Sequence, residues 1–124
     1  MKKALWLLVA VPVFLAACGG EEPKSAAADA LVLPGDAELD SRNVEYKCED
    51  GRDITVQYLN KGDNRLAVVP VSDSSTLVFA NVISGSGARY AAAQYIWWSK
   101  GAEATLYKEW MGGEPVNGVV CRER

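Results

Sequence analysis

The segment SGSGARYAAAQYIWWSKG, residues 84–101, places two adjacent tryptophans between two glycine-containing turns. Its second half is rich in aromatic residues, which are typical of β-strands. Successive side chains of a strand point to opposite faces, so Trp97 and Trp98 lie on opposite sides of any sheet that contains them. We therefore predict that one tryptophan fills the core and that the other lies at least partly at the surface.

Both ends of this segment have turn sequences. Ser99-Lys100-Gly101 predicts a three-residue hairpin turn with Gly101 in the left-handed conformation and Lys100 near the tip. At the other end, the glycines of residues 84–87 allow another backbone to approach closely. The two turns can lie at the same end of a barrel only if the chain reverses between them, and residues 91–94 (AAAQ) are the candidate position for that reversal.

Outside this segment, short runs of β-branched and aromatic residues alternate with turn-forming clusters. Residues 53–59 (DITVQYL) show a clear period of two, and Pro70 favours a strand end or a sheet edge. Residues 102–110 (AEATLYKEW) have helical propensity as well, but their alternation favours a strand. The expected strands are 44–48, 53–59, 65–71, 76–84, the stretch that ends in YIWWS, 102–110 and 119–123. Turns at intervals of roughly eight to twelve residues predict one all-β domain of about eight short antiparallel strands, either a barrel or a sandwich.

The cysteines indicate a disulfide rather than a metal site. Cys48 and Cys121 lie near opposite ends of the predicted domain, and in an oxidising compartment we expect them to pair. A metal site is the alternative, but the sequence has no histidine and no CxxC motif. The absence of histidine also excludes Ser-His and Cys-His catalysis.

The N-terminus predicts a lipoprotein signal. Two lysines precede an apolar run from Ala4 to Ala17, which is shorter than the ~20 residues that span a bilayer as a helix. The following quartet, LAAC at 15–18, matches the bacterial lipobox, in which the cysteine thiol is acylated; an ordinary signal peptide with an incidental cysteine is the alternative. Gly19 in place of aspartate favours the outer membrane, with the domain facing the periplasm. We expect a signal peptide at 1–17, a tether lipidated on Cys18 at 18–41, and the folded domain at 42–124.

The charge of the mature chain is negative. Cleavage before Cys18 leaves 11 of the 13 basic residues and all 16 acidic residues, which gives 11 − 16 = −5. This sign disfavours a nucleic-acid partner, since the phosphate backbone is itself negative.

Three classes of function fit these observations. In an enzyme, Lys100 would activate Ser86 as a Ser-Lys dyad, but that chemistry needs a neutral, buried amine and the predicted turn is exposed. In a binding module, the turns would enter another protein from a rigid, disulfide-closed scaffold. The third class is a structural or small-ligand-binding envelope lipoprotein.

The motifs resemble those of a known family. SGARY at 86–90 followed by YIWWSKG at 95–101, between two cysteines and behind a lipobox, closely resembles the membrane-bound inhibitors of c-type lysozyme of Gram-negative bacteria. The likeness extends to YKCEDGR, TVQYLNKGDN, LAVVPVSD and TLYKEW, and Ala93 stands where such proteins commonly have glycine.

This resemblance implies an eight-stranded antiparallel barrel without enzymatic activity, cofactor or metal. Its motif loops would enter the active-site cleft of c-type lysozyme, with Ser86 and Lys100 in contact with the catalytic carboxylates. The remaining residues of the expected contact region are Gly87 and Gly101, which permit the turns, and Tyr90, Tyr95 and Trp98, which would support the loops or form the rim. C-type lysozymes are basic as a class, so the acidic mature chain complements this partner.

Overall fold

A computed structural model describes residues 30–124 of the chain. The predicted signal peptide and Cys18 lie outside the described residues. Residues 33–124 form one compact unit, to which all the contacts below belong. Within the described part of the chain, no helix has the length and apolar character needed to cross a membrane.

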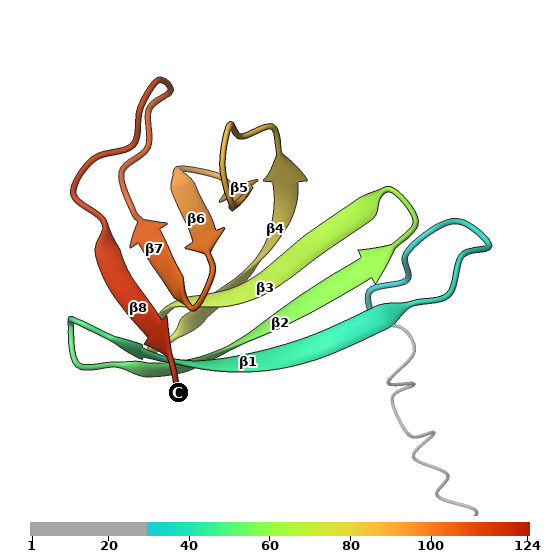
Figure 1. The fold of residues 1–124 in the computed structure, drawn as a ribbon, viewed down its shortest axis with the longest axis horizontal. Coiled ribbons are helices and arrows are strands. Elements are labelled where there is room, and N and C mark those ends of the chain that lie inside the picture. The colour runs from blue at the N-terminus through green and yellow to red at the C-terminus, as the bar shows by residue number, and fades with distance from the viewer. Residues whose placement is uncertain (1–29) are drawn as a thin grey trace, which may run out of the picture. The chain divides into compact units, whose positions relative to one another are not determined.

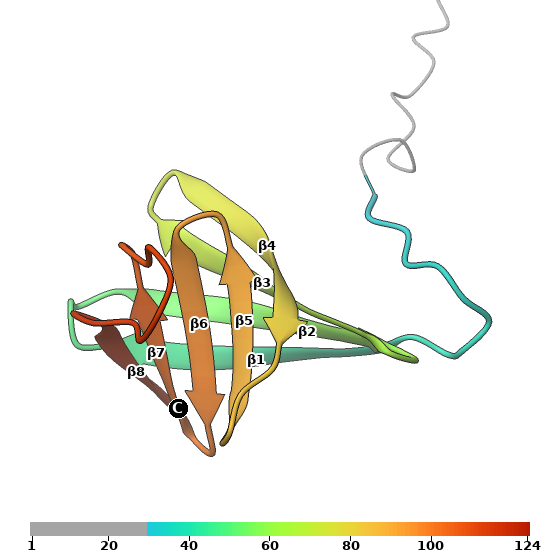
Figure 2. The same ribbon diagram turned by 90° about the horizontal axis from the view of Figure 1, so that it is seen from above.

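The compact unit is a closed barrel in which each strand pairs antiparallel with the next and the last strand pairs with the first (Figures 1 and 2). The predicted all-β class and strand number are therefore confirmed, and the barrel is the correct alternative. Its strands are β1 (Asp40–Cys48), β2 (Asp53–Lys61), β3 (Asn64–Ser72), β4 (Ser75–Val82), β5 (Ala88–Ala92), β6 (Tyr95–Lys100), β7 (Glu103–Tyr107) and β8 (Val119–Glu123).

The barrel closes where β1 meets β8. Cys48 and Cys121 are directly opposite each other in this antiparallel pair, and their sulfurs form the predicted disulfide. The bond joins residues 73 positions apart, so it ties together the first and last strands of the fold. Closure gives β1 and β8 a neighbour on both sides, although β1 pairs with β8 only over Tyr46–Cys48, so the sheet keeps little of the open edge of an unclosed one.

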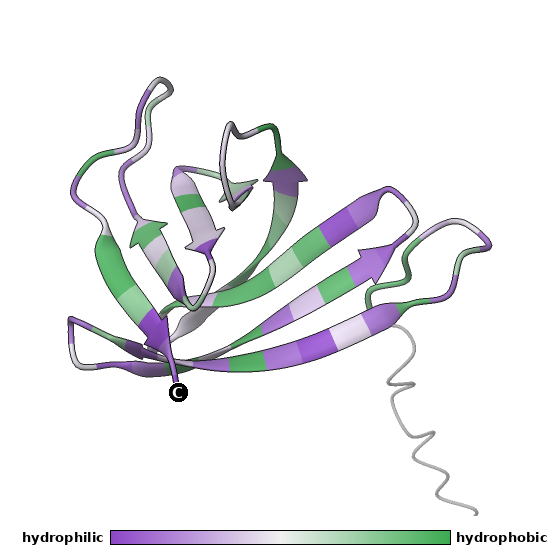
Figure 3. Cartoon of the chain, in the orientation of Figure 1, coloured by the Kyte–Doolittle hydropathy of each residue, from purple (hydrophilic) through white to green (hydrophobic). Residues whose placement is uncertain are grey.

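The core follows from alternation along the strands, which is visible as bands of hydropathy in Figure 3. In β2, Ile54, Val56 and Tyr58 are buried while their neighbours Thr55 and Gln57 are more exposed. The same period is clear in β3, which buries Ala67, Val69 and Val71, and in β7, which buries Ala104 and Leu106. The buried interior consists of Tyr46, Cys48, Ile54, Val56, Tyr58, Ala67, Val69, Val71, Phe79, Tyr90, Trp97, Ala104, Leu106 and Cys121.

A hydrogen-bonded aromatic network crosses this interior. The indole N–H of Trp97 donates to the Tyr58 hydroxyl at 2.9 Å, and the hydroxyls of Tyr58 and Tyr46 are 2.8 Å apart. The Tyr46 and Trp97 rings also meet edge to face, with centroids 5.2 Å apart. The network satisfies the polar atoms that these large side chains carry into the core, so the barrel buries them without the cost of an unpaired group.

Several strand boundaries differ from the sequence-based prediction. β1 begins at Asp40 rather than Val44, so the barrel includes the last two residues of the predicted tether. β7 ends at Tyr107 rather than Trp110, because the chain leaves the sheet there and the Trp110 N–H donates to the Gln94 carbonyl at 2.7 Å. Residues 108–118 therefore form a loop between β7 and β8.

The position of Pro70 in the sheet agrees with its lack of a backbone N–H group. Pro70, which cannot donate to a ladder, lies beyond the residues of β3 that pair with β2 and beside an irregularity in the β3–β4 ladder.

In the segment before β1, the Lys61 ammonium donates to the Leu33 carbonyl at 3.0 Å. This contact fixes the chain from Leu33 onward against the β2–β3 hairpin.

Removal of the disulfide should strongly destabilise the barrel. In the chain-entropy model a closed loop of this length contributes about 4 kcal/mol to the free energy of unfolding. We expect the double variant Cys48→Ala/Cys121→Ala to lose about that amount in urea denaturation of residues 18–124 carrying Cys18→Ser, which cannot be lipidated. Unchanged stability would mean that strand pairing alone closes the barrel.

The buried Tyr46 predicts a loss of stability at high pH. Burial, followed by the hydrogen bond to Tyr58, raises the pKa of Tyr46 well above its usual value. The folded state therefore keeps a proton that the unfolded chain releases above about pH 10, and stability falls as the pH rises past that value. Urea unfolding between about pH 8 and pH 11 should show this loss, and Tyr46→Phe should make it shallower.

Candidate functional site

A hairpin of β5 and β6 carries the segment singled out in the sequence. The chain reverses at Ala93-Gln94, and the ladder runs from Ala92 opposite Tyr95 to Ala88 opposite Ser99. The predicted reversal is therefore confirmed. Ala93 has a φ of 47°, a left-handed conformation that glycine adopts more readily than alanine.

This reversal brings together the two turns predicted at the ends of residues 84–101, which we call the two corners. The loop between β4 and β5 and the turn between β6 and β7 lie side by side at one end of the barrel (Figure 2). We call this end, with residues 84–87 on one loop and residues 100–102 on the other, the corner end. The contacts of Gly87 and Trp98 show how closely the two loops are held.

Gly87 is the point of closest approach. Its φ is 63°, and a Cβ at this position would overlap the backbone oxygen of Ser99 and lie 2.7 Å from Lys100 Cγ. The Ser84 hydroxyl donates to the Gly87 carbonyl at 3.1 Å and closes the loop on itself. Only glycine combines this backbone conformation with this separation, so the residue sets the distance between the two corners.

Trp98 connects both corners through one side chain. Its indole N–H donates to the Ser86 carbonyl at 2.9 Å, and the Lys100 ammonium lies 4.2 Å from the centroid of its ring. The second contact is a cation–π interaction, which favours a positive charge over the face of the indole. As predicted, Trp97 fills the core whereas Trp98 is half-buried on the outer side.

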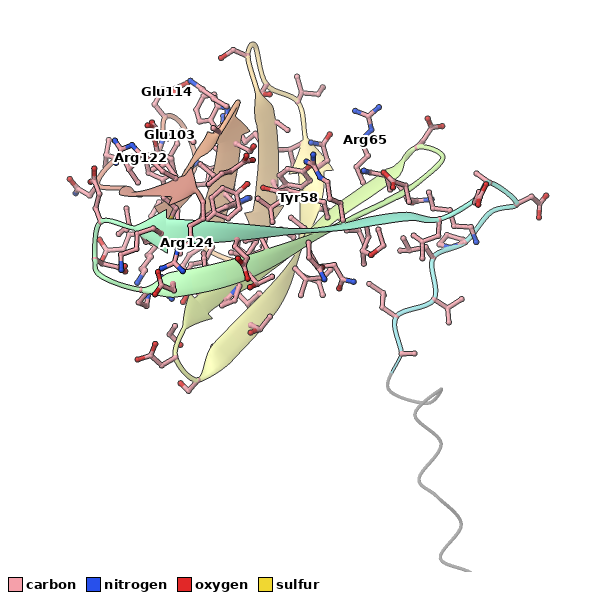
Figure 4. The ribbon with its side chains drawn as sticks, turned by 60° about the horizontal axis from the view of Figure 1, so that its bottom comes forward. Tyr58, Arg65, Glu103, Glu114, Arg122 and Arg124 are labelled. Carbon is pink, nitrogen blue, oxygen red and sulfur yellow. A yellow bond between two sulfur atoms is a disulfide. The ribbon has the colours of Figure 1, made fainter. Side chains whose placement is uncertain are left out.

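Lys100 is the last residue of β6 and not the tip of a three-residue turn. It pairs with Glu103 across the two-residue turn Gly101-Ala102, so the predicted turn type is wrong. The Glu103 carboxylate bonds to Arg122 at 3.4 Å, and Figure 4 shows these two side chains together. Among residues 30–124, no carboxylate forms an ion pair with the exposed Lys100 ammonium, which leaves this charge available to a partner.

Two residues of the expected contact region lie away from the surface of the corner end. Tyr90 is 6% exposed inside the barrel, where its ring lies 5.8 Å from that of Tyr58 and burial raises its pKa. Tyr95 lies at the opposite end of the hairpin and faces Phe79 at 6.5 Å. In these positions the two tyrosines can support the hairpin, which is one of the two roles expected of them.

The sequence-based prediction missed two residues beside the site. Arg89 lies opposite Trp98 in the β5–β6 ladder, and Trp110 covers the arginine from the β7–β8 loop. Arg89 could have been placed from the hairpin register once the reversal was known. Trp110 could not have been placed in this way, because residues 102–110 alternate like a strand and were predicted to form one.

The geometry gives no support to a Ser-Lys dyad. No hydrogen bond joins the Ser86 hydroxyl to the Lys100 amine among the described residues, and both residues are exposed. Nor do residues 30–124 contain a group of three acidic, cysteine or histidine side chains that could hold a metal ion. A rigid, disulfide-closed barrel that presents an ammonium and a hydroxyl on adjoining corners has the features of a small protein-binding module.

Comparison with known proteins defines the family. The family model described as membrane-bound lysozyme-inhibitor of c-type lysozyme (MliC) matches residues 46–115. A protein of Pseudomonas aeruginosa named membrane-bound lysozyme inhibitor of C-type lysozyme is 71% identical, over all of both chains. Proteins of the same name from Cupriavidus necator and Escherichia coli are 40% and 36% identical, over 79% and 87% of this chain and 74% and 84% of their own. The chain belongs to this family.

A solved structure shows the same fold in a relative. The crystal structure of Pseudomonas aeruginosa MliC in complex with hen egg white lysozyme has 68% sequence identity and a TM-score of 0.70. The similarity covers 82% of this chain and 100% of that one.

Three glycine substitutions should separate backbone strain from steric overlap at the corner end. We expect Gly85→Ala to be nearly neutral, since an added Cβ has open space. Gly101→Ala also has space but a φ of 60°, and should cost about 1 kcal/mol. Gly87→Ala adds overlap with β6 to the same strain and should cost at least about 2 kcal/mol in urea denaturation. Equal losses for residues 87 and 101 would contradict the close approach described above.

Proposed function

We propose that this chain is an inhibitor of c-type lysozyme that inserts its corner end into the active-site cleft of the enzyme. The family, the names of the relatives and the lysozyme complex of the Pseudomonas aeruginosa protein support the partner. The observation that carries the mode of binding is the exposed Lys100 ammonium, which has no carboxylate partner among the described residues and is held over the Trp98 ring.

The chemistry of the two corners matches the chemistry of the cleft. Lysozyme hydrolyses its substrate with two carboxyl groups, one protonated as general acid and one ionised. A lysine ammonium has three donors and a positive charge, and it can bond strongly to the ionised carboxylate. The Ser86 hydroxyl both donates and accepts, which suits the carboxyl group that keeps its proton. Together they would occupy the place of the sugar and neutralise the catalytic pair.

The scaffold reduces the cost of this binding. Gly87 and Trp98 hold the two corners against each other before any partner arrives. Because the loops are already ordered, less conformational entropy is lost on association. In this proposal Gly101 permits the turn, Trp98 lies at the rim, and Tyr90 and Tyr95 support the hairpin from within.

The charges of the two proteins would assist their encounter. The mature chain, with a formal charge of 11 − 16 = −5, is attracted to a basic enzyme. This attraction acts on the association rate and weakens with salt, whereas the local contacts of Lys100 and Ser86 determine the dissociation rate. The association rate should therefore fall as the ionic strength rises, and it should change by a larger factor than the dissociation rate.

The relatives' description as membrane-bound fits a lipid anchor on Cys18. We infer that the mature chain is attached by this cysteine to the outer membrane and faces the periplasm. Several acyl chains on one cysteine give stable attachment, whereas one does not. Cys18→Ser should release the protein from the membrane fraction, and the purified chain should still inhibit lysozyme.

Substitution of the two corner residues tests the proposed contacts. Lys100→Ala would leave a buried carboxylate of the enzyme unpaired, so we expect inhibition to weaken by at least about thirtyfold. Ser86→Ala removes a single hydrogen bond and should weaken it by about threefold to tenfold. Both inhibition constants come from lysis of bacterial cell walls by a c-type lysozyme, with melting temperatures recorded in parallel.

Lys47→Ala is the matched control, because it removes the same charge from a residue of β1 that belongs to neither loop of the corner end, and it should leave inhibition almost unchanged. No inhibition by the native chain at micromolar concentration would overturn the proposed function. Loss of folding in Lys100→Ala would instead assign that residue a structural role.

A further inference from the structure

Arg89 lies at the centre of a stack of cations and aromatic rings on the outer side of β5 and β6. Its guanidinium carbon is 5.0 Å from the ring centroid of Trp98 and 5.8 Å from that of Trp110. With the Lys100 ammonium on Trp98, the contacts form a continuous series from Lys100 through Trp98 and Arg89 to Trp110. The series joins the corner end to the β7–β8 loop.

The loop that carries Trp110 is fixed at several points. The Trp110 backbone N–H donates to the Gln94 carbonyl at 2.7 Å, and its indole N–H donates to the Gly113 carbonyl at 2.9 Å. A guanidinium N–H of Arg89 reaches the same carbonyl at 3.5 Å. Ile96, which points outward from β6 next to Trp98, is fully buried. The loop thus forms a packed cover over this side of the hairpin.

Arg89 is held in this position at an energetic cost. Its Nε atom is buried and has no hydrogen-bond partner among the described residues. A buried donor without a partner is unfavourable, and an apolar side chain of similar size would avoid the cost. Packing alone therefore does not explain an arginine here, whereas a cation that orients the indole does.

The geometry points to Arg89 as a positioning residue that, held by Trp110, fixes the Trp98 indole and through it the Lys100 ammonium and the Ser86 carbonyl. Trp98 needs one ring orientation to donate to Ser86 while presenting its face to Lys100. A guanidinium confined against the same ring restricts that orientation. The β7–β8 loop would thereby set how well ordered the corner end is before a partner binds.

The first test uses the free protein and needs no partner. Protons above an aromatic ring resonate upfield, so the ε-methylene protons of Lys100 should be shifted upfield in carbon-correlated NMR spectra of the native chain. Trp98→Leu should abolish the shift. Arg89→Gln and Trp110→Leu should each reduce it, while Lys47→Gln, with the same loss of charge on β1, should leave it unchanged. An unaltered Lys100 shift in both Arg89→Gln and Trp110→Leu would overturn the inference.

The second test rests on the proposed function and uses a double-mutant cycle. Arg89→Gln alone should weaken lysozyme inhibition by about tenfold, the size of a favourable cation–π contact. In a Lys100→Ala background the same substitution should have almost no further effect, because the group that it positions is absent. Equal losses in both backgrounds would show that Arg89 acts independently of Lys100 and would overturn the inference.

The two proposals can fail separately. If the native chain does not inhibit lysozyme, the proposed function is wrong, and the NMR comparison still decides the role of Arg89. Arg89→Lys keeps the charge but loses the planar guanidinium, and it should recover part of the Lys100 shift. A dispersed spectrum for each variant confirms that it is folded.

Discussion

The register between β5 and β6 is the constraint on which the site depends. It places Tyr90 opposite Trp97 inside the barrel and Arg89 opposite Trp98 outside it. Because side chains alternate, a slip of one residue would exchange the inner and outer sets. Trp98 would then enter the core, and the support beneath Lys100 would be lost.

The core and the site secure this register together. On the inner face, the observed pairing places the Trp97 indole within hydrogen-bond distance of the Tyr58 hydroxyl. On the outer face and at the corner end, the Trp98 bond to Ser86 and the close approach of Gly87 to Ser99 depend on the same alignment. The two adjacent tryptophans are therefore complementary: one specifies the barrel, and the other specifies the arrangement of the loops.

Much of this arrangement could be predicted from the sequence, because it depends on local periodicity. The alternation in residues 53–59 and the opposite faces of the two tryptophans follow from patterns that span only a few residues. The pairing of Cys48 with Cys121 follows from the number of cysteines. The features that were missed depend on contacts between distant segments. The loop after Tyr107 leaves the sheet because Trp110 finds partners on the β5–β6 hairpin, and its own sequence carries no sign of them.

Closure of the sheet has a consequence for how this molecule can recognise others. An open sheet edge can bind an extended segment of another chain by adding it as a further strand, and it can bind copies of itself in the same way. In residues 40–123 each strand already has a neighbour on both sides. Closure therefore limits strand addition to the stretches of β1 and β4 that extend beyond their short ladders with β8 and β5. Elsewhere on the barrel, recognition must proceed through side chains and loops.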